Sequence, residues 1–125
     1  IVGIEKNIFG KEQNPLFDFY GVINKKDEMI KIYDQCNIFL LPSYIEGFPK
    51  VINECLARQR PVIIFNEIDY VVNGREGIFQ CKRNFDELFK LSKYIIENYK
   101  IIQNKMLSNK NYTRINFQKN LLNKI

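Results

Sequence analysis

The sequence predicts an α/β domain in which helices cover both faces of a parallel sheet, giving three layers. Short and almost wholly apolar runs alternate with segments whose apolar residues recur at helical spacing. Polar and apolar residues do not alternate in these runs, as they would in a sheet with one solvent-exposed face. The runs are therefore typical of strands buried on both faces. A chain of 125 residues that is 46% hydrophobic can bury one domain core.

Two strands are expected near the start, at residues 1–4 and 16–20, and Gly21 stops the second one. A helix should follow, with Asn24 as its N-cap and two acidic residues in its first turn, where the helix dipole favours negative charge. The chain opens on Ile1 without an initiator Met, as if a strand were already under way. We therefore expect it to be a fragment of a longer protein.

The middle of the chain supplies a strand, a loop, a helix and another strand. Residues 36–41 form an apolar run that ends at Pro42, and a loop covers residues 43–48. Pro49 is a good first residue for the next helix, because its missing N–H would have had no partner there. Residues 61–65 are again wholly apolar and predict a buried strand.

The last third is expected to be mainly helical. Two glycines bracket a turn before a short strand at residues 77–80. Asn84 and Glu87 have the spacing of a capping box, and an apolar stripe at helical spacing follows them. The remainder, to Ile125, is expected to be helical with a break near residues 108–113.

Charge is distributed unevenly along the chain. Residues 1–81 carry nine basic and eleven acidic groups, for −2, whereas residues 82–125 carry ten and three, for +7. We expect a domain at residues 1–100, incomplete at its N-terminus, and a basic helical tail at residues 101–125. Such a tail is either a solvated helix or a surface that attracts nucleic acid or an anionic membrane.

Histidine is absent, which removes the commonest metal ligand and the commonest general base near neutral pH. The three cysteines, at positions 36, 55 and 81, are widely spaced in apolar surroundings and show no metal-ligand spacing. They are expected to be buried thiols of a reducing compartment. No run of about 18 apolar residues occurs, so no membrane span is expected.

The segment Glu46–Glu54 is the part of the sequence that indicates chemistry. It follows the end of a predicted buried strand and enters the start of a helix, the place where a doubly wound sheet binds ligands. A helix N-terminus offers unpaired N–H groups to a diphosphate, and Gly47 allows close backbone approach. Two carboxylates beside an anion site suit sugar hydroxyls, which donate charge-assisted hydrogen bonds to them. The pattern favours a nucleotide-sugar site.

This segment resembles the E-x7-E signature of glycosyltransferase family 4, the glycosyl transferases of group 1. Its flanks resemble the family's in the same order, at residues 19–22, 32–43, 60–63 and 69–77, so the likeness covers about residues 1–100. The resemblance implies a Rossmann-like domain, the C-terminal and donor-binding half of the two-domain arrangement called GT-B.

The resemblance also implies an activity. The enzyme would move a sugar from a nucleotide-sugar donor, such as a UDP- or GDP-sugar, to a glycan or lipid-linked acceptor with retention of anomeric configuration. No metal and no other cofactor is expected, and neither is nucleic acid as a partner. Polysaccharide or lipopolysaccharide biosynthesis in the cytoplasm is the expected setting, with the basic tail touching the inner face of the membrane. A separate N-terminal domain would bind the acceptor.

Roles for individual residues follow from the same resemblance. The position of Glu46 contacts the transferred sugar near the reacting carbon, which makes Glu46 the candidate catalytic residue. The position of Glu54 binds the ribose hydroxyls, and Gly21 and Val22 stand where main chain usually holds the nucleobase. Lys50 replaces an expected small or amide residue; it either neutralises a phosphate or points to solvent. The candidate substrate-binding residues are Gly21, Val22, Gly47, Phe48, Pro49, Lys50 and Glu54.

Two departures from the family pattern limit this interpretation. The Arg or Lys pair that holds the diphosphate in the family would lie before Ile1, and residues 6–15 are short for the expected helix. Lys6 and Lys11 are candidates to replace this basic pair only because they lie near its expected place in the sequence. The 125-residue chain alone is therefore expected to bind nucleotide sugar weakly and to transfer little.

Three other classes of protein are alternatives to this interpretation. A non-catalytic relative would keep the fold without turnover. A dinucleotide-binding domain is disfavoured because no G-x-G-x-x-G follows a strand. A nucleic-acid-binding module would use the aromatic residues among the tail's lysines, although their helical spacing favours packing. These aromatics are Tyr94, Tyr99, Tyr112 and Phe117.

Overall fold

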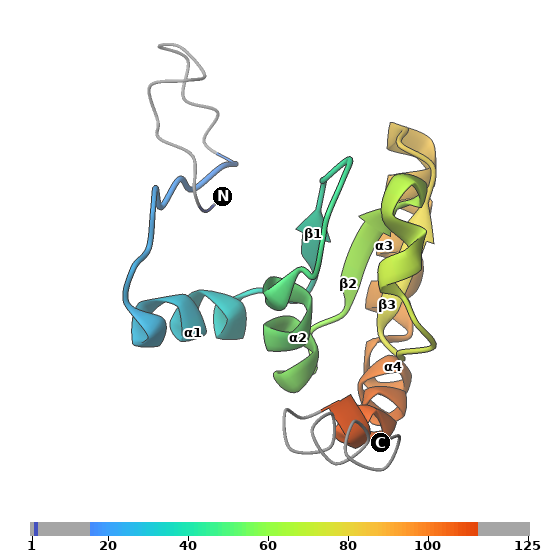
Figure 1. The fold of residues 1–125 in the computed structure, drawn as a ribbon. Helices are drawn as coiled ribbons and strands as arrows, with labels where there is room; N and C mark the ends of the chain where they lie inside the picture. The colour runs from blue at the N-terminus through green and yellow to red at the C-terminus, as the bar shows by residue number, and fades with distance from the viewer. Residues whose placement is uncertain (1, 3–15, 113–125) are drawn as a thin grey trace. The chain divides into compact units, whose positions relative to one another are not determined.

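The computed structural model describes Val2 and residues 16–112, and these fall into two compact units (Figure 1). The first extends to Gln35 and the second begins at Cys36. Each unit is described by itself below.

The described part of the first unit contains one helix, α1, at Lys26–Gln35. The helix starts two residues after Asn24, so the expected N-cap is wrong; the carbonyl of Lys25 accepts from the amide of Met29 at 3.2 Å. Residues 16–20 do not form the expected strand, and Leu16 is 85% exposed. Among the described residues only Gly21 pairs here, in a single parallel bridge to Val2. A strand needs a continuous partner for its backbone groups, and one bridge does not supply it.

The second unit is built on a three-stranded parallel sheet in the order β1-β2-β3. The strands are β1 at Phe39–Leu41, β2 at Val62–Phe65 and β3 at Ile78–Cys81. Leu41 pairs with Ile64, and Phe65 pairs with Cys81. The α/β class with a parallel sheet, predicted from the apolar runs, is confirmed.

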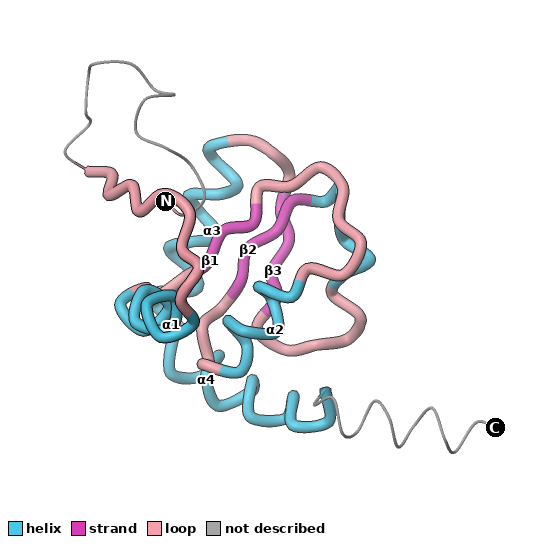
Figure 2. Tube along the Cα trace, turned by 60° about the vertical axis from the view of Figure 1, so that its left-hand side comes forward, coloured by secondary structure: helices cyan, strands magenta, loops and turns pink. Residues whose placement is uncertain are grey.

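Helices cover this sheet (Figure 2). Helix α2, at Lys50–Ala57, packs against β2, and α3, at Phe85–Glu97, packs against β3. All four residues of β2 are buried. Since neighbouring side chains of a strand point to opposite faces, both faces of the sheet are covered at β2, as its apolar sequence predicts.

The starts of α2 and α3 agree with the sequence to within one residue. Pro49 occupies the N-cap of α2 instead of its first turn. Asn84 caps α3 as predicted, and its side-chain oxygen accepts from the amide of Glu87 at 2.9 Å. The remaining helices are η2, a 3-10 helix at Asn66–Val71, then α4 at Tyr99–Met106 and the 3-10 helix η3 at Leu107–Tyr112.

Helix α4 is fastened to the end of the sheet opposite the loop after β1. The hydroxyl of Tyr99 donates to the carbonyl of Asn37 at 2.8 Å, and Ile102 and Met106 are buried. Residues 113–125, the greater part of the expected tail, lie outside the described residues. The division of the chain at residue 100 stays a prediction.

The cysteines differ from expectation at one position. Cys55 and Cys81 are buried, but Cys36 is exposed, because β1 begins only at Phe39 and Cys36 lies outside the sheet. Burial, with a smaller contribution from the Glu54 carboxylate, raises the pKa of the Cys55 thiol to about 12. Cys55 therefore stays a neutral, core-filling thiol near neutral pH.

Gly77, the residue before β3, tests how tightly α4 is packed. Its φ is 88°, and a Cβ would lie 2.6–2.8 Å from three side-chain atoms of Met106. Gly77→Ala should lower the free energy of unfolding by about 2–4 kcal/mol, since a left-handed backbone and overpacking both cost stability. Gly74→Ala is the matched control, because Gly74 has φ of 67° and open space around it, with an expected loss of about 1–2 kcal/mol. Equal losses in chemical denaturation would contradict close packing of α4.

Candidate functional site

The candidate site lies at the edge of the sheet where all three strands end. Because the strands are parallel and in register, the segments that leave them start side by side. The loop at residues 42–49 leaves β1, η2 leaves β2, and residues 82–84 leave β3. The loop between β1 and α2 is called the β1–α2 loop below.

Glu46 lies in the β1–α2 loop and is half-buried. Its carboxylate accepts a hydrogen bond from the Ser43 hydroxyl, with 2.5 Å between Oγ and Oε1. Its backbone is held by Tyr70 of η2: the Glu46 amide donates to the tyrosine oxygen at 3.0 Å, and the tyrosine hydroxyl donates to the Glu46 carbonyl. Both the carboxylate and the backbone of Glu46 are therefore fixed by neighbouring side chains.

The N-terminus of α2 differs from that of α3 in its capping. Pro49 provides no side-chain cap, and the first turn of α2 contains no acidic residue. Helix α3 has the Asn84 cap and two acidic residues in its first turn. The positive end of α2 is therefore not satisfied by its own N-cap, and it can interact with an anion.

The other predicted residues of this segment lie on the same loop and helix. Phe48 is 74% exposed, and Lys50 and Glu54 are exposed on α2. A Cβ at Gly47 would meet nothing within 4 Å, so the fold itself does not require glycine there. The structure thus brings Glu46, Gly47, Phe48, Pro49, Lys50 and Glu54 together as one continuous surface segment.

Gly21 and Val22 belong to the first unit. Gly21 forms the bridge to Val2, and the side chain of Val22 is exposed. Their expected contact with a nucleobase stays a prediction. Lys6 and Lys11, the candidate substitutes for the missing basic pair, lie outside the described residues.

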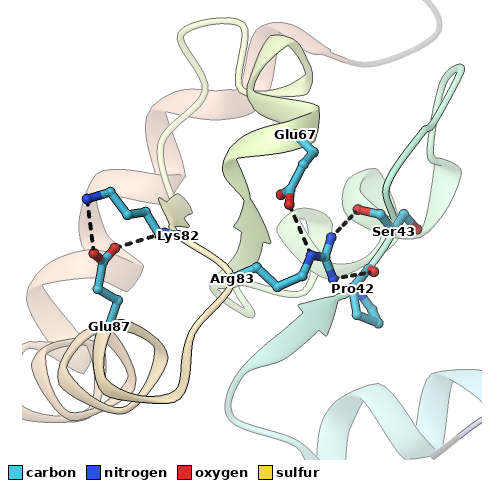
Figure 3. A network of polar contacts seen from close by, with 6 residues as sticks. All are labelled: Pro42, Ser43, Glu67, Lys82, Arg83 and Glu87. Carbon is cyan, nitrogen blue, oxygen red and sulfur yellow. Dashed lines mark hydrogen bonds and ion pairs between the residues drawn. The ribbon is translucent and has the colours of Figure 1, made fainter.

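Arg83 is a site residue that the sequence interpretation missed (Figure 3). It follows β3, and its guanidinium donates to the carbonyls of Pro42 and Ser43, at 3.0 Å each. Its Nε donates to the Glu67 carboxylate at 3.1 Å, and this bond contributes to a lowered pKa of Glu67, after the larger effect of a backbone hydrogen bond. The available signal was its position, shortly after the end of the predicted strand at residues 77–80, at the ligand-binding edge of the sheet.

The Arg83 guanidinium also lies between two aromatic rings. Its central carbon is 3.8 Å from the centroid of the Tyr44 ring and 4.2 Å from that of Phe65. Both distances are within the range of a cation–π interaction. Arg83 therefore holds the start of the β1–α2 loop by a cation–π contact with Tyr44 as well as by hydrogen bonds.

A second arginine holds α2. Arg75 is buried and donates to the Asn53 side-chain oxygen at 2.5 Å and to the carbonyl of Val71. Asn53 precedes Glu54, so this contact fixes the part of α2 that carries the second carboxylate.

Across residue 2 and residues 16–112, no cluster of three or more His, Cys, Asp or Glu side chains has the arrangement of a metal site. None of the helices in that part of the chain is long and apolar enough to cross a membrane.

The three-stranded parallel sheet and the helices that cover it are consistent with a Rossmann-like α/β domain of the glycosyltransferase class. Residues 1–98 match the family described as "Glycosyl transferases group 1". The chain belongs to this family, as its Glu46–Glu54 segment and flanks predict.

Three curated proteins illustrate the relationship. The chain is 22% identical over 103 residues to a Campylobacter jejuni N,N'-diacetylbacillosaminyl-diphospho-undecaprenol alpha-1,3-N-acetylgalactosaminyltransferase, covering 74% of this chain and 27% of that protein. It is 29% identical over 85 residues to an uncharacterized Haemophilus influenzae glycosyltransferase, covering 65% and 24%. It is 37% identical over 67 residues to the Staphylococcus aureus capsular polysaccharide biosynthesis glycosyltransferase CapM, covering 51% and 18%.

The chain therefore spans about a quarter or less of the length of these relatives. No solved structure matches it significantly.

Tyr70 tests the anchoring of Glu46. Tyr70→Phe keeps the ring but removes the hydroxyl that bonds both the amide and the carbonyl of Glu46. Hydrogen exchange of the Glu46 amide, followed by NMR, should accelerate by about tenfold, equivalent to about 1.4 kcal/mol, the size of one net hydrogen bond. Tyr94→Phe is the control, since Tyr94 lies on α3, where its ring makes a T-shaped contact with Phe79 of β3. Unchanged exchange in Tyr70→Phe would show that Tyr70 does not hold Glu46.

Proposed function

We propose that this chain is the donor-binding part of a retaining glycosyltransferase that uses a nucleotide sugar. The observation that carries the proposal is the arrangement at the β1–α2 loop, where the Ser43-bound carboxylate of Glu46 directly precedes the uncapped start of α2. Membership of the glycosyltransferase family supports it.

The roles of the residues follow from their positions. Glu46 accepts hydrogen bonds from hydroxyls of the transferred sugar and places its reacting carbon. Gly47, Phe48 and Pro49 shape the backbone around the sugar and the diphosphate. Glu54, on the exposed side of α2, accepts from the ribose hydroxyls. Since Ile52 and Cys55 on the same helix are buried, the core fixes which side α2 presents to a ligand.

Charge stabilisation would come from the protein itself. When the nucleoside diphosphate departs, its developing negative charge lies at the α2 N-terminus, with Lys50 on the same turn. Preorganised amides and a cation stabilise such a charge without reorganising in the transition state. The acceptor then attacks the oxocarbenium-like sugar from the face that the leaving group vacates, so the configuration is retained. This scheme needs no metal.

The acceptor is proposed to be a glycan or a lipid-linked glycan. Two relatives support it, since one is named for a diphospho-undecaprenol-linked sugar and the other for capsular polysaccharide biosynthesis. A cytoplasmic location, and a membrane contact through the basic residues after 100, belong to the same proposal. The membrane contact is supported by the charge of +7 on residues 82–125, with ten basic and three acidic groups.

Glu54→Ala is the direct test of donor binding. In the complete protein, a panel of UDP- and GDP-sugars should raise the melting temperature of the wild type. Glu54→Ala should lose this shift, because charge-assisted hydrogen bonds to the ribose are removed, at a cost of about 1.5–3 kcal/mol or about 10- to 150-fold in affinity. Glu97→Gln is the matched control, as it removes an exposed helical carboxylate on α3.

A transfer assay with the same sugars separates the proposed function from its rival, a non-catalytic relative. Such a relative would transfer no sugar to any acceptor, either as the wild type or as Glu46→Gln. A full melting-temperature shift in Glu54→Ala would refute the assignment of the ribose site.

A further inference from the structure

The β1–α2 loop has few means of holding its own backbone. Pro42 and Pro49 have no N–H to donate, and the loop contains no regular hydrogen-bonded structure between them. Its shape must therefore come from contacts with other segments. Two residues provide these contacts, Tyr70 at Glu46 and Arg83 at the loop's start.

Arg83 contacts the loop in a way that fixes both position and direction. Its two terminal nitrogens reach the consecutive carbonyls of Pro42 and Ser43, and such a fork sets the orientation of the backbone as well as its distance. Glu67 and the rings of Tyr44 and Phe65 fix the guanidinium in turn. The arginine side chain is 25% exposed, so these contacts are partly shielded from water.

Ser43 is the link from this arginine to the chemistry. The residue whose carbonyl accepts from Arg83 also donates its hydroxyl to the Glu46 carboxylate, at 2.5 Å. Fixing the Ser43 backbone sets the position of its Cβ, and from there one rotamer brings the hydroxyl to the Glu46 carboxylate. We propose that Arg83 is a positioning residue for sugar transfer, acting through Ser43 to orient the carboxylate of Glu46.

This inference rests on the proposed function, and it adds a residue that the E-x7-E segment does not contain. It also predicts a split between two parts of the donor. Arg83 acts on Glu46, which is assigned to the sugar. Its hydrogen bonds and ring contacts go to the β1–α2 loop, β2 and η2 instead of α2, whose Glu54 is assigned to the ribose. Loss of Arg83 should therefore affect handling of the sugar more than binding of the nucleotide.

Lys82 is a control provided by the chain itself. It is the preceding residue, and its ammonium pairs with Glu87 on α3 at 3.7 Å instead of reaching the loop (Figure 3). Lys82→Gln and Arg83→Gln each remove one positive charge at the same place in the chain. Only the second substitution removes contacts with the β1–α2 loop.

The experiment compares these variants in the complete protein. Arg83→Gln should lower kcat/KM for sugar transfer by about 10- to 100-fold, the range expected when a reacting group is displaced by a fraction of an ångström to one ångström. The dissociation constant of the nucleoside diphosphate alone should stay within about twofold. Lys82→Gln should leave both values within about twofold. Arg83→Lys should recover only part of the loss, since an ammonium cannot bond two carbonyls in a planar fork or stack between rings.

Ser43→Ala tests the last link with a smaller change. It should reproduce the pattern of Arg83→Gln, with a lower kcat/KM and unchanged nucleoside diphosphate binding, and the double variant should be no worse than the more severe single one. This variant also carries the test if Arg83→Gln does not fold.

Three results would overturn the inference. Arg83→Gln could behave like Lys82→Gln, Ser43→Ala could keep full activity, or Arg83→Gln could weaken nucleotide binding and transfer equally, as a general loss of structure would. Failure of the proposed function is a different result, because the wild type would then neither bind nor transfer from any nucleotide sugar. Hydrogen exchange of the Ser43–Glu46 amides, which should accelerate in Arg83→Gln but not in Lys82→Gln, tests the loop contact independently of donor identity.

Discussion

The parallel pairing of β2 with strands on both sides is the constraint on which the candidate site depends. Val62–Phe65 is buried along its whole length, and its register with β1 and β3 leaves Leu41, Phe65 and Cys81 at one edge of the sheet. The next residues along each strand are therefore neighbours. This is why Glu67, Arg83 and the carbonyls of Pro42 and Ser43, which come from three separate parts of the chain, form one network. A one-residue slip would move Arg83 by about 3.3 Å and turn its neighbours to the other face.

The site combines a rigid support with exposed chemical groups. Ile52, Cys55 and Leu56 of α2 are buried, and Arg75 ties Asn53 to the turn after η2. Glu54 and Phe48 are nevertheless exposed. A ligand therefore meets side chains that stand on a fixed backbone, which lowers the conformational entropy lost on binding. The exposed aromatic residue at the loop is consistent with a surface that is covered when substrate is present.

The sequence predicted the elements whose signal is local and missed the contacts that depend on pairing. The wholly apolar β2 run and the Asn84 cap of α3 were both readable from neighbouring residues. The strand expected at residues 16–20 was wrong because apolar composition does not show whether a partner exists to complete the backbone hydrogen bonds. The prediction that Cys36 is buried was wrong for a similar reason. Its apolar neighbours do not show that the pairing of β1 starts only at Phe39. Glu46 and Glu54 were identifiable by their spacing. The contacts of Tyr70 and Arg83 with the β1–α2 loop were not, because they join residues 24 to 41 positions apart in the sequence.

The missed contacts are also the ones that give the carboxylates their geometry. A carboxylate on an unrestrained loop can bind a sugar hydroxyl, but it loses the benefit of orientation, which accounts for much of the rate enhancement in group transfer. In this chain the prolines that bound the β1–α2 loop lack backbone donors, and the loop contains no regular hydrogen-bonded structure between them. The stabilisation comes instead from the neighbouring strand ends, through one arginine and one tyrosine. In the proposed site the motif supplies the chemical groups, while the segments that follow the parallel strands supply the residues that orient them.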